Sequence, residues 1–178
     1  MEQYQIQGEN QQVSSFELGW LCGVIESEGN FSIYKWTRRK TINYQPWMGI
    51  MNTDKIMIEK ASELLKRLKI AYYIGKPRKL PKRKFCYQIR ISGYKRIKRL
   101  LDLIGNLLIT KRDRAIILKK FVEKRLNLKK QNGCWSNTHF DQEDESLFQQ
   151  LRKLNQRGDP RDHQEDSSKE DEGMVRAV

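Results

Sequence analysis

Two glycines four residues apart, Gly19 and Gly23, lie in a segment whose apolar residues recur at helical spacing. On a helix they share one face, and Cys22 keeps the surroundings of that face small, so a second backbone can approach closely. A chain with this pattern is expected to fold so that the bare face meets another helix. We therefore predict Gly19, Cys22 and Gly23 to be interface residues.

The glycine-bearing helix is predicted to run from about residue 15 to residue 26. Ser14 and Glu17 form a capping box at its start, and Gly29 permits an abrupt exit into a strand. Glu28 then lies at the helix end, where the helix dipole disfavours a negative charge. This placement favours a functional carboxylate over an ordinary surface charge, and a carboxylate is a hard oxygen ligand suited to Mg²⁺.

Four segments with alternating apolar residues predict antiparallel strands. Their ranges are 30–37, 46–51, 72–79 and 85–92, and a loop over 37–45 joins the first two. Polar residues at 52–54, Ser92 and Thr110 are predicted to cap the helices that follow them. Those helices are expected to end near Lys69, Ile104 and Leu128, and a short helix is expected over 146–154.

This order of elements predicts an α+β fold, in which helices cover one side of a four-stranded antiparallel sheet. Residues 14–154 are predicted to form a single domain, which the length of the chain also favours. A polar segment over 1–13 precedes the domain. The acidic tail over 155–178 lacks apolar periodicity and is expected to be disordered.

The uncovered side of the sheet is predicted to bind nucleic acid. Polar and aromatic side chains alternate outward on the first strand, and the last strand and two loops add basic residues. A bare solvated face is the alternative, but the density of Arg, Lys, Gln, Tyr and Trp favours contacts with phosphates and bases. The predicted DNA-binding residues are Asn30, Ser32, Tyr34, Trp36, Arg38, Arg39, Lys40, Lys76, Arg78, Lys82, Arg83, Lys84, Gln88 and Arg90.

The charge of the chain supports this prediction. Residues 1–140 contain 29 Lys and Arg against 11 Asp and Glu, so this part is more basic than the net charge of +13 for all 178 residues suggests. Such a surface attracts nucleic acids or anionic membranes. Because no apolar run could span a bilayer and no secretory or lipidation pattern is present, a soluble, intracellular protein without a membrane partner is expected.

Residues 21–29, Leu-Cys-Gly-Val-Ile-Glu-Ser-Glu-Gly, resemble the signature of the LAGLIDADG homing endonucleases, with Cys in place of Ala and Glu in place of both Asp. The order of elements over roughly residues 15–128 is also similar to that family. The resemblance implies an αββαββα core with a saddle-shaped sheet that faces double-stranded DNA. It also implies that Glu28 is the catalytic metal ligand and that Glu26 has a supporting role at the helix interface.

Two further catalytic residues are implied by the resemblance alone. Asn52 matches a polar position that places water and metal, and Lys111 falls where the family commonly has a basic residue that stabilises transition-state charge. A helix cap and a surface cation are the respective alternatives. The expected cofactor is Mg²⁺, with Mn²⁺ as a substitute or Ca²⁺ in a non-cleaving complex.

The motif occurs once in the chain, so one chain supplies half of a two-helix interface and one Glu28. We therefore expect a homodimer that makes a sequence-specific double-strand break in a long pseudo-palindromic DNA site, as an intron-encoded homing endonuclease. An intron RNA maturase, with intron RNA as a partner, or a DNA-binding regulator that has lost cleavage, remains an alternative. A structural adaptor whose basic surface follows acidic proteins is a third hypothesis.

Overall fold

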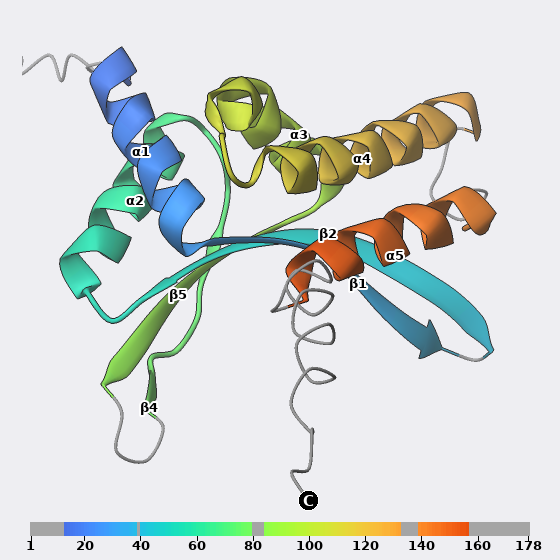
Figure 1. Ribbon diagram of the computed structural model, residues 1–178, viewed down its shortest axis with the longest axis horizontal. Helices are drawn as coiled ribbons and strands as arrows, with labels where there is room; N and C mark the ends of the chain where they lie inside the picture. Colours follow the sequence, from blue (N-terminus) through green and yellow to red (C-terminus); the bar gives the residue numbers. More distant parts are fainter. Residues whose placement is uncertain (1–12, 39, 80–83, 133–138, 157–178) are drawn as a thin grey trace, which may run out of the picture.

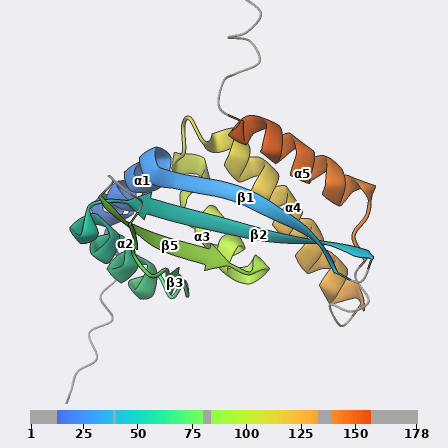
Figure 2. The ribbon, with the colours of Figure 1, turned by 90° about the horizontal axis from the view of Figure 1, so that it is seen from below.

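The computed structural model describes residues 13–38, 40–79, 84–132 and 139–156. Helices cover one face of an antiparallel sheet and leave the opposite face open (Figure 1). Figure 2, seen from below, shows the strands in front of the helical layer. In chain order the elements are α1 (Ser15–Glu28), β1 (Gly29–Arg38), β2 (Thr41–Asn52), α2 (Lys55–Arg67), β3 (Tyr73–Ile74), β4 (Arg78–Lys79), β5 (Phe85–Ser92), α3 (Tyr94–Ile104), the 3₁₀ turn η1 (Gly105–Leu107), α4 (Arg112–Asn132) and α5 (Gln142–Asn155). The predicted α+β class is confirmed.

The sheet has the order β1-β2-β5-β3, with β4 paired to the other end of β5. The prediction of one continuous strand over residues 72–79 is wrong, because β3 and β4 are two short segments along the same edge of β5. Pro77 lies between them and cannot donate a hydrogen bond to the ladder. The two short segments together take the place of the predicted third strand.

The hairpin between β1 and β2 is longer than predicted. The predicted loop over residues 37–45 is wrong, because β2 begins at Thr41 and Trp36 pairs with Asn43. Lys40 has a positive φ of 67°, the backbone conformation that tight hairpin connections use. Polar residues at alternate positions of β2 point to the open face and hid the strand pattern in the sequence.

The hydrophobic core lies between the covered face of the sheet and the helices. The sheet contributes Phe31, Ile33, Met48, Ile50, Ile89 and Ile91, each at most 4% exposed. These residues alternate with the open-face positions of the same strands, as a half-buried sheet requires. The register is therefore set by burial, since a shift by one residue would bring the apolar side chains into water.

Helix α5 is an integral part of this core rather than a short addition. It begins at Gln142, four residues earlier than predicted, because Asp141 and Asp144 form a capping box. Arg125 on α4 and Asp144 are both buried, and their charged groups lie 3.4 Å apart. Arg125 also donates a hydrogen bond to the His139 carbonyl at 2.7 Å, so α5 is tied to α4.

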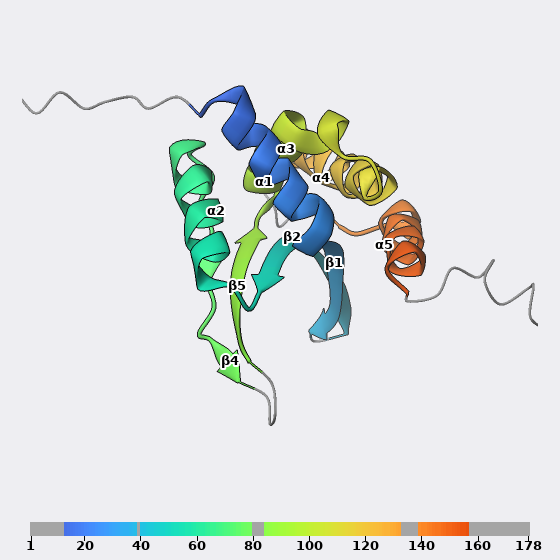
Figure 3. The same cartoon turned by 60° about the vertical axis from the view of Figure 1, so that its left-hand side comes forward.

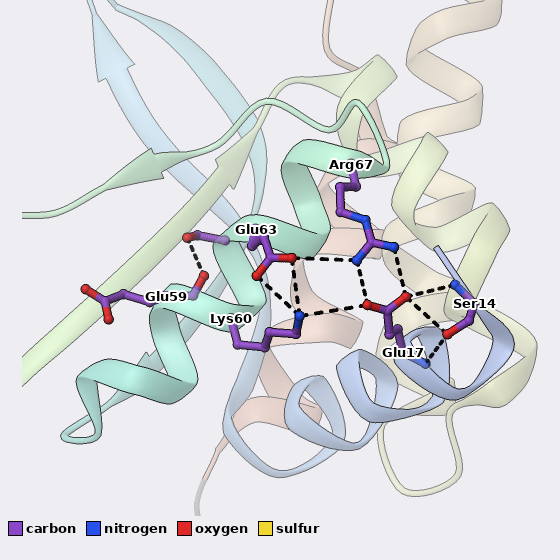
Figure 4. A network of polar contacts seen from close by, with 7 residues as sticks. Ser14, Glu17, Glu59, Lys60, Glu63 and Arg67 are labelled. Carbon is purple, nitrogen blue, oxygen red and sulfur yellow. Dashed lines mark hydrogen bonds and ion pairs between the residues drawn. The ribbon is translucent and has the colours of Figure 1, made fainter. Parts of the chain in front are cut away.

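Helices α1 and α2 are neighbours (Figure 3), and an ionic network joins them (Figure 4). The Arg67 guanidinium donates to both carboxylate oxygens of Glu17, at 2.5 and 2.9 Å. Lys60 approaches the same carboxylate at 3.8 Å, and Glu17 also completes the capping box with Ser14. This network fixes the start of α1 against α2.

Within the described residues, no helix is long and apolar enough to cross a membrane. The predicted polar N-terminal segment lies outside the described residues apart from Val13, and so does the predicted acidic tail beyond Gln156. Arg39, Lys82 and Arg83, three of the predicted DNA-binding residues, also lie outside them.

Candidate active site and nucleic-acid interface

The end of α1 brings together the residues predicted for chemistry. At Gly29 the chain turns directly from the helix into β1, with φ −73° and ψ 144°, and the Gly29 N–H donates to the Ile25 carbonyl. A Cβ at this position would lie 2.2 Å from the Ile25 oxygen. Glycine is therefore needed for the close approach of two backbone segments and not for a left-handed conformation.

Glu28 is exposed at this junction. In the described part of the chain its carboxylate forms no hydrogen bond and no ion pair. The pairing of Gly29 with Ile50 brings Glu28 level with the end of β2, next to the sheet. The carboxylate is therefore free to bind a ligand at the edge of the open face.

The Lys111 side chain reaches the same helix end from the loop before α4. Its ammonium group donates to the carbonyls of Ile25, Ser27 and Gly29 at 3.2, 3.1 and 2.6 Å. Burial lowers the pKa of Lys111, against the opposite effect of the nearby Glu26 carboxylate. A cation at a helix C-terminus is stabilising and offsets the unfavourable placement of Glu28.

Glu26 is engaged inside its own chain. Its carboxylate accepts hydrogen bonds from the backbone N–H groups of Ile109, Thr110 and Lys111, at 3.2, 2.5 and 2.9 Å, and from the Thr110 hydroxyl. Burial raises the pKa of Glu26, but these hydrogen bonds outweigh it, so the net shift is downward. The carboxylate therefore holds the start of α4, and Thr110, predicted as a cap, donates to Glu26 instead. The predicted interface role of Glu26 stays a prediction beside this internal one.

Asn52 acts locally in the described chain. Its side-chain oxygen accepts a hydrogen bond from the Asp54 N–H at 2.8 Å, and Asp54 in turn caps α2. Asn52 therefore forms an Asx turn that precedes the cap, and the cap itself is Asp54. A role in placing water or metal stays a prediction.

The glycine face of α1 is open. Gly19 and Gly23 are exposed, and a Cβ at either position would meet nothing within 4 Å. Phe16, one turn earlier on the helix, is 83% exposed. Cys22, by contrast, is buried in the core of its own chain, so its predicted place in the interface is corrected to a core position.

The open sheet face is rich in aromatic and polar groups. Tyr34 and Trp36 stack with ring centroids 5.7 Å apart, on the same side of β1 as Asn30 and Ser32. Lys40, Lys76, Lys84 and Arg90 are exposed and Gln88 is half-buried on or beside this face. Arg38 and Arg78 lie in β1 and β4, but the structure describes only their backbone.

Trp47 is a residue of this face that the sequence analysis missed. The Arg90 guanidinium lies over its ring, 5.2 Å from the centroid. The ring also lies over Gly49, where a Cβ would come within 2.7 Å of it. Alternation within the full length of β2, from Asn43 through Trp47, is the signal that would have identified it.

No group of three or more His, Cys, Asp or Glu side chains in the described residues could hold a metal ion by itself. Glu28 supplies a single oxygen-bearing group of the right chemistry. A divalent cation at this helix end would need further ligands from a second chain or from substrate phosphates.

Comparisons with known proteins find solved structures of similar fold. A search of curated proteins finds no match. Among solved structures, the archaeal intron-encoded homing endonuclease I-Vdi141I in complex with DNA has a TM-score of 0.62 at 18% identity, covering 80% of this chain and 86% of that one. The homing endonuclease I-CvuI, in complex with its target in the presence of Ca, has a TM-score of 0.59 at 15% identity, covering 80% and 83%.

A third similar structure is a longer protein. The I-SmaMI LAGLIDADG homing endonuclease bound to cleaved DNA has a TM-score of 0.57 at 17% identity, and the match covers 85% of this chain but 46% of that one. The family model described as a LAGLIDADG-like domain matches residues 15–105, which is just over half of the 178 residues. The chain therefore belongs to the LAGLIDADG family.

Proposed function

We propose that this protein is a site-specific DNA endonuclease of the homing type, which cuts both strands as a homodimer with a divalent metal ion bound by Glu28. The observation that supports this most directly is the state of Glu28. It is an exposed carboxylate, without a hydrogen bond or ion pair in the described residues, at the end of a helix where its charge is otherwise unfavourable.

Double-stranded DNA is the proposed ligand of the open sheet face. Arg90, Lys84 and Lys76 would neutralise phosphates, while Ser32, Gln88 and other polar side chains would hydrogen bond to base edges. The structures of I-Vdi141I and I-CvuI are complexes with DNA and have the same fold. The half-site would lie along β1, β2 and β5, which are the three longest strands of the sheet.

A homodimer is proposed because one chain is incomplete as a nuclease. Gly19 and Gly23 leave a bare face on α1, and a second α1 would fill it with close backbone contacts. I-SmaMI, of which the match covers less than half, has room in one chain for a second domain of similar size. Twofold pairing would bring two Glu28 carboxylates together and predicts two similar half-sites.

Each residue at the proposed centre has a separate task. The metal ion, when bound, activates water and stabilises charge on the reacting phosphate. Glu28 of each chain would hold an ion together with substrate phosphates. Glu26 and Lys111 position the helix end that carries Glu28, and the Lys111 ammonium adds positive charge beside it. Asn52 is proposed to orient water at the end of β2.

Selection of cleaved sites from a random duplex library, in Mg²⁺, tests this proposal. We expect discrete double-strand products with a pseudo-palindromic consensus that EDTA abolishes. Glu28→Gln should bind the selected site with unchanged affinity and not cut it, whereas Asp113→Asn, which removes an exposed acid elsewhere, should cut normally. Cutting by Glu28→Gln would refute the role of Glu28, and a strictly monomeric protein on cleaved DNA would refute the homodimer.

An intron RNA maturase and a non-cleaving DNA-binding regulator are the competing functions. A maturase would promote splicing of a group I intron transcript without cutting duplex DNA. A regulator would select a DNA sequence by binding in the library experiment, yet produce no cleaved molecules.

A further inference from the structure

A basic hollow of about 550 Å³ lies between the end of α2, the outer side of α3 and α4. Leu103 and Leu126 form its apolar part. Its charged lining residues are Lys69, Lys95, Arg96, Lys98, Arg99 and Asp102, that is, five cations and one acid.

The single acid of the hollow is already neutralised. Asp102 pairs with Lys98 at 2.6 Å and with Lys119 at 2.7 Å. In the described part of the chain, the side chains of Lys69, Lys95, Arg96 and Arg99 form no hydrogen bond or ion pair. Like charges held this close repel one another, and a bound polyanion would remove the repulsion.

Lys69 occupies a backbone position that glycine would fill more easily. Its φ is 56°, in the left-handed region. The N–H of Lys69 donates to the Lys66 carbonyl, and that of Ile70 donates to the Leu65 carbonyl, both at 2.9 Å. This is the Schellman end of a helix, where glycine is the usual residue. A lysine here adds a cation to the hollow at a conformational cost.

The hollow lies on the opposite side of the molecule from the open sheet face. Helix α3 lies over the covered face of the sheet (Figures 1 and 2). It packs there through Ile97, Leu100, Leu101 and Ile104, so the exposed Lys95, Arg96 and Arg99 lie on the other side of the helix. A straight duplex bound to the sheet would therefore not reach them. A ligand of the hollow would therefore be separate from DNA on the sheet.

We propose that the hollow binds the phosphate backbone of a second nucleic-acid segment, separate from the DNA on the sheet. Phosphate oxygens are the groups that clustered Lys and Arg bind. Among the described residues, the lining includes no aromatic ring and no side-chain amide, so it has few means of reading bases and would bind without regard to sequence. This second site goes beyond the proposed cleavage and does not depend on it.

A bridging assay tests the proposal with the full chain. Protein is captured on an immobilised 30-base-pair DNA duplex, and a labelled duplex RNA or duplex DNA of equal length is then added. We expect wild-type protein to capture the second duplex. The variant Lys95→Gln/Arg96→Gln/Arg99→Gln should capture roughly tenfold less of the second duplex and should still bind the immobilised DNA. The slope of log affinity against log salt for the second duplex should fall by the equivalent of about two to three phosphate contacts.

The matched control removes three exposed cations elsewhere, in Arg112→Gln/Arg152→Gln/Lys153→Gln, and should bridge like wild type. The ratio of captured RNA to captured DNA identifies which backbone is preferred. The proposal would be overturned if both triple variants captured the second duplex equally well, or if wild-type protein captured none. It would also be overturned if polyglutamate competed for the hollow as well as nucleic acid does. Arg90→Gln should weaken only the first binding step, and unchanged binding of the immobilised DNA by this variant would count against the sheet interface and not against the hollow.

Lys69→Gly separates binding from stability. If Lys69 is there for a ligand, the variant should melt at a higher temperature and capture the second duplex several times less well. Unchanged capture by the more stable variant would remove Lys69 from the site.

Discussion

Glu26 in α1 and Lys111 just before α4 make reciprocal contacts. The Glu26 carboxylate accepts a hydrogen bond from the Lys111 N–H at 2.9 Å, and the Lys111 ammonium donates to the Gly29 carbonyl at the end of α1, the helix that contains Glu26. The end of α1 and the start of α4 are therefore fixed by two charged groups of opposite sign, each at the helix terminus that its charge stabilises. The exposed Glu28 lies at this end of α1, so its position depends on the contacts of Glu26 and Lys111.

Replacing Lys111 with Met should destabilise the fold as well as reduce cleavage. Three hydrogen bonds from a charged donor would be lost, and the free energy of unfolding should fall by about 1–3 kcal/mol. Urea denaturation measures this change. Arg112→Met, which removes the adjacent exposed cation, should leave the urea midpoint unchanged. An unchanged midpoint in both variants would show that the Lys111 hydrogen bonds contribute nothing to stability.

Gly23 in α1 and Gly29 at the C-terminal cap of that helix should respond to alanine in opposite ways. Gly23→Ala meets nothing within 4 Å and should stabilise an isolated chain by about 0.5–1 kcal/mol, while weakening dimerisation roughly tenfold or more. Gly29→Ala would press a methyl group against the Ile25 carbonyl and should destabilise the chain by about 1–3 kcal/mol. Thermal melts and analytical ultracentrifugation measure the two effects. Undiminished dimerisation of Gly23→Ala would place the interface elsewhere.

Arg90 and Trp47 should act together in DNA binding. Arg90→Gln removes one phosphate-binding cation and its contact with the Trp47 ring, so the slope of log affinity against log salt should decrease by about 1. Trp47→Ala should weaken binding at every salt concentration with little change in that slope. Fluorescence anisotropy with a labelled duplex, at several salt concentrations, distinguishes the two. Normal binding by both variants would mean that DNA does not contact this part of the sheet.

The order of elements could be predicted because apolar periodicity reports burial directly. The helix ending in Gly29, the strict alternation of β5 and the caps before α2 are all local patterns. The early part of β2 was missed because Asn43 and Gln45 lie on the open face of the sheet. Polar residues at these positions gave the segment a composition that is typical of a loop. The break between β3 and β4 was missed because the predicted strand over residues 72–79 ran through Pro77, which cannot donate a hydrogen bond to the ladder.

Contacts between distant residues account for most of what the sequence could not reveal about the site. Glu28 and Lys111 were named from the motif and the order of elements. The pairing of Glu26 with residues 109–111 joins positions more than 80 residues apart, and no periodicity encodes it. The burial of Cys22 likewise depends on how α1 lies across the sheet and not on the spacing of small residues along the helix.

Acid should unfold this protein through two carboxylates. The Arg67 guanidinium lowers the pKa of Glu17 from 4.5 to about 2, and the Lys35 ammonium and the Tyr44 hydroxyl lower the pKa of Glu145 to about 2. Both pKa values are lower in the folded state, so the stabilisation is complete above pH 4.5 and is lost as the pH falls toward 2. Glu17→Gln should be less stable at neutral pH and lose less stability over this interval. A curve parallel to that of Asp113→Asn would contradict this assignment.

The buried pair of Arg125 and Asp144 should be the most sensitive charged contact in the fold. Arg125 is 1% exposed and Asp144 is fully buried, so Asp144→Ala would leave a guanidinium in the core without its counterion. We expect the free energy of unfolding to fall by about 3–5 kcal/mol. The double variant Arg125→Leu/Asp144→Ala should recover much of that loss, because no buried charge remains. Urea denaturation of the two single variants and the double variant measures the coupling, and additive losses would show that the charges do not depend on each other.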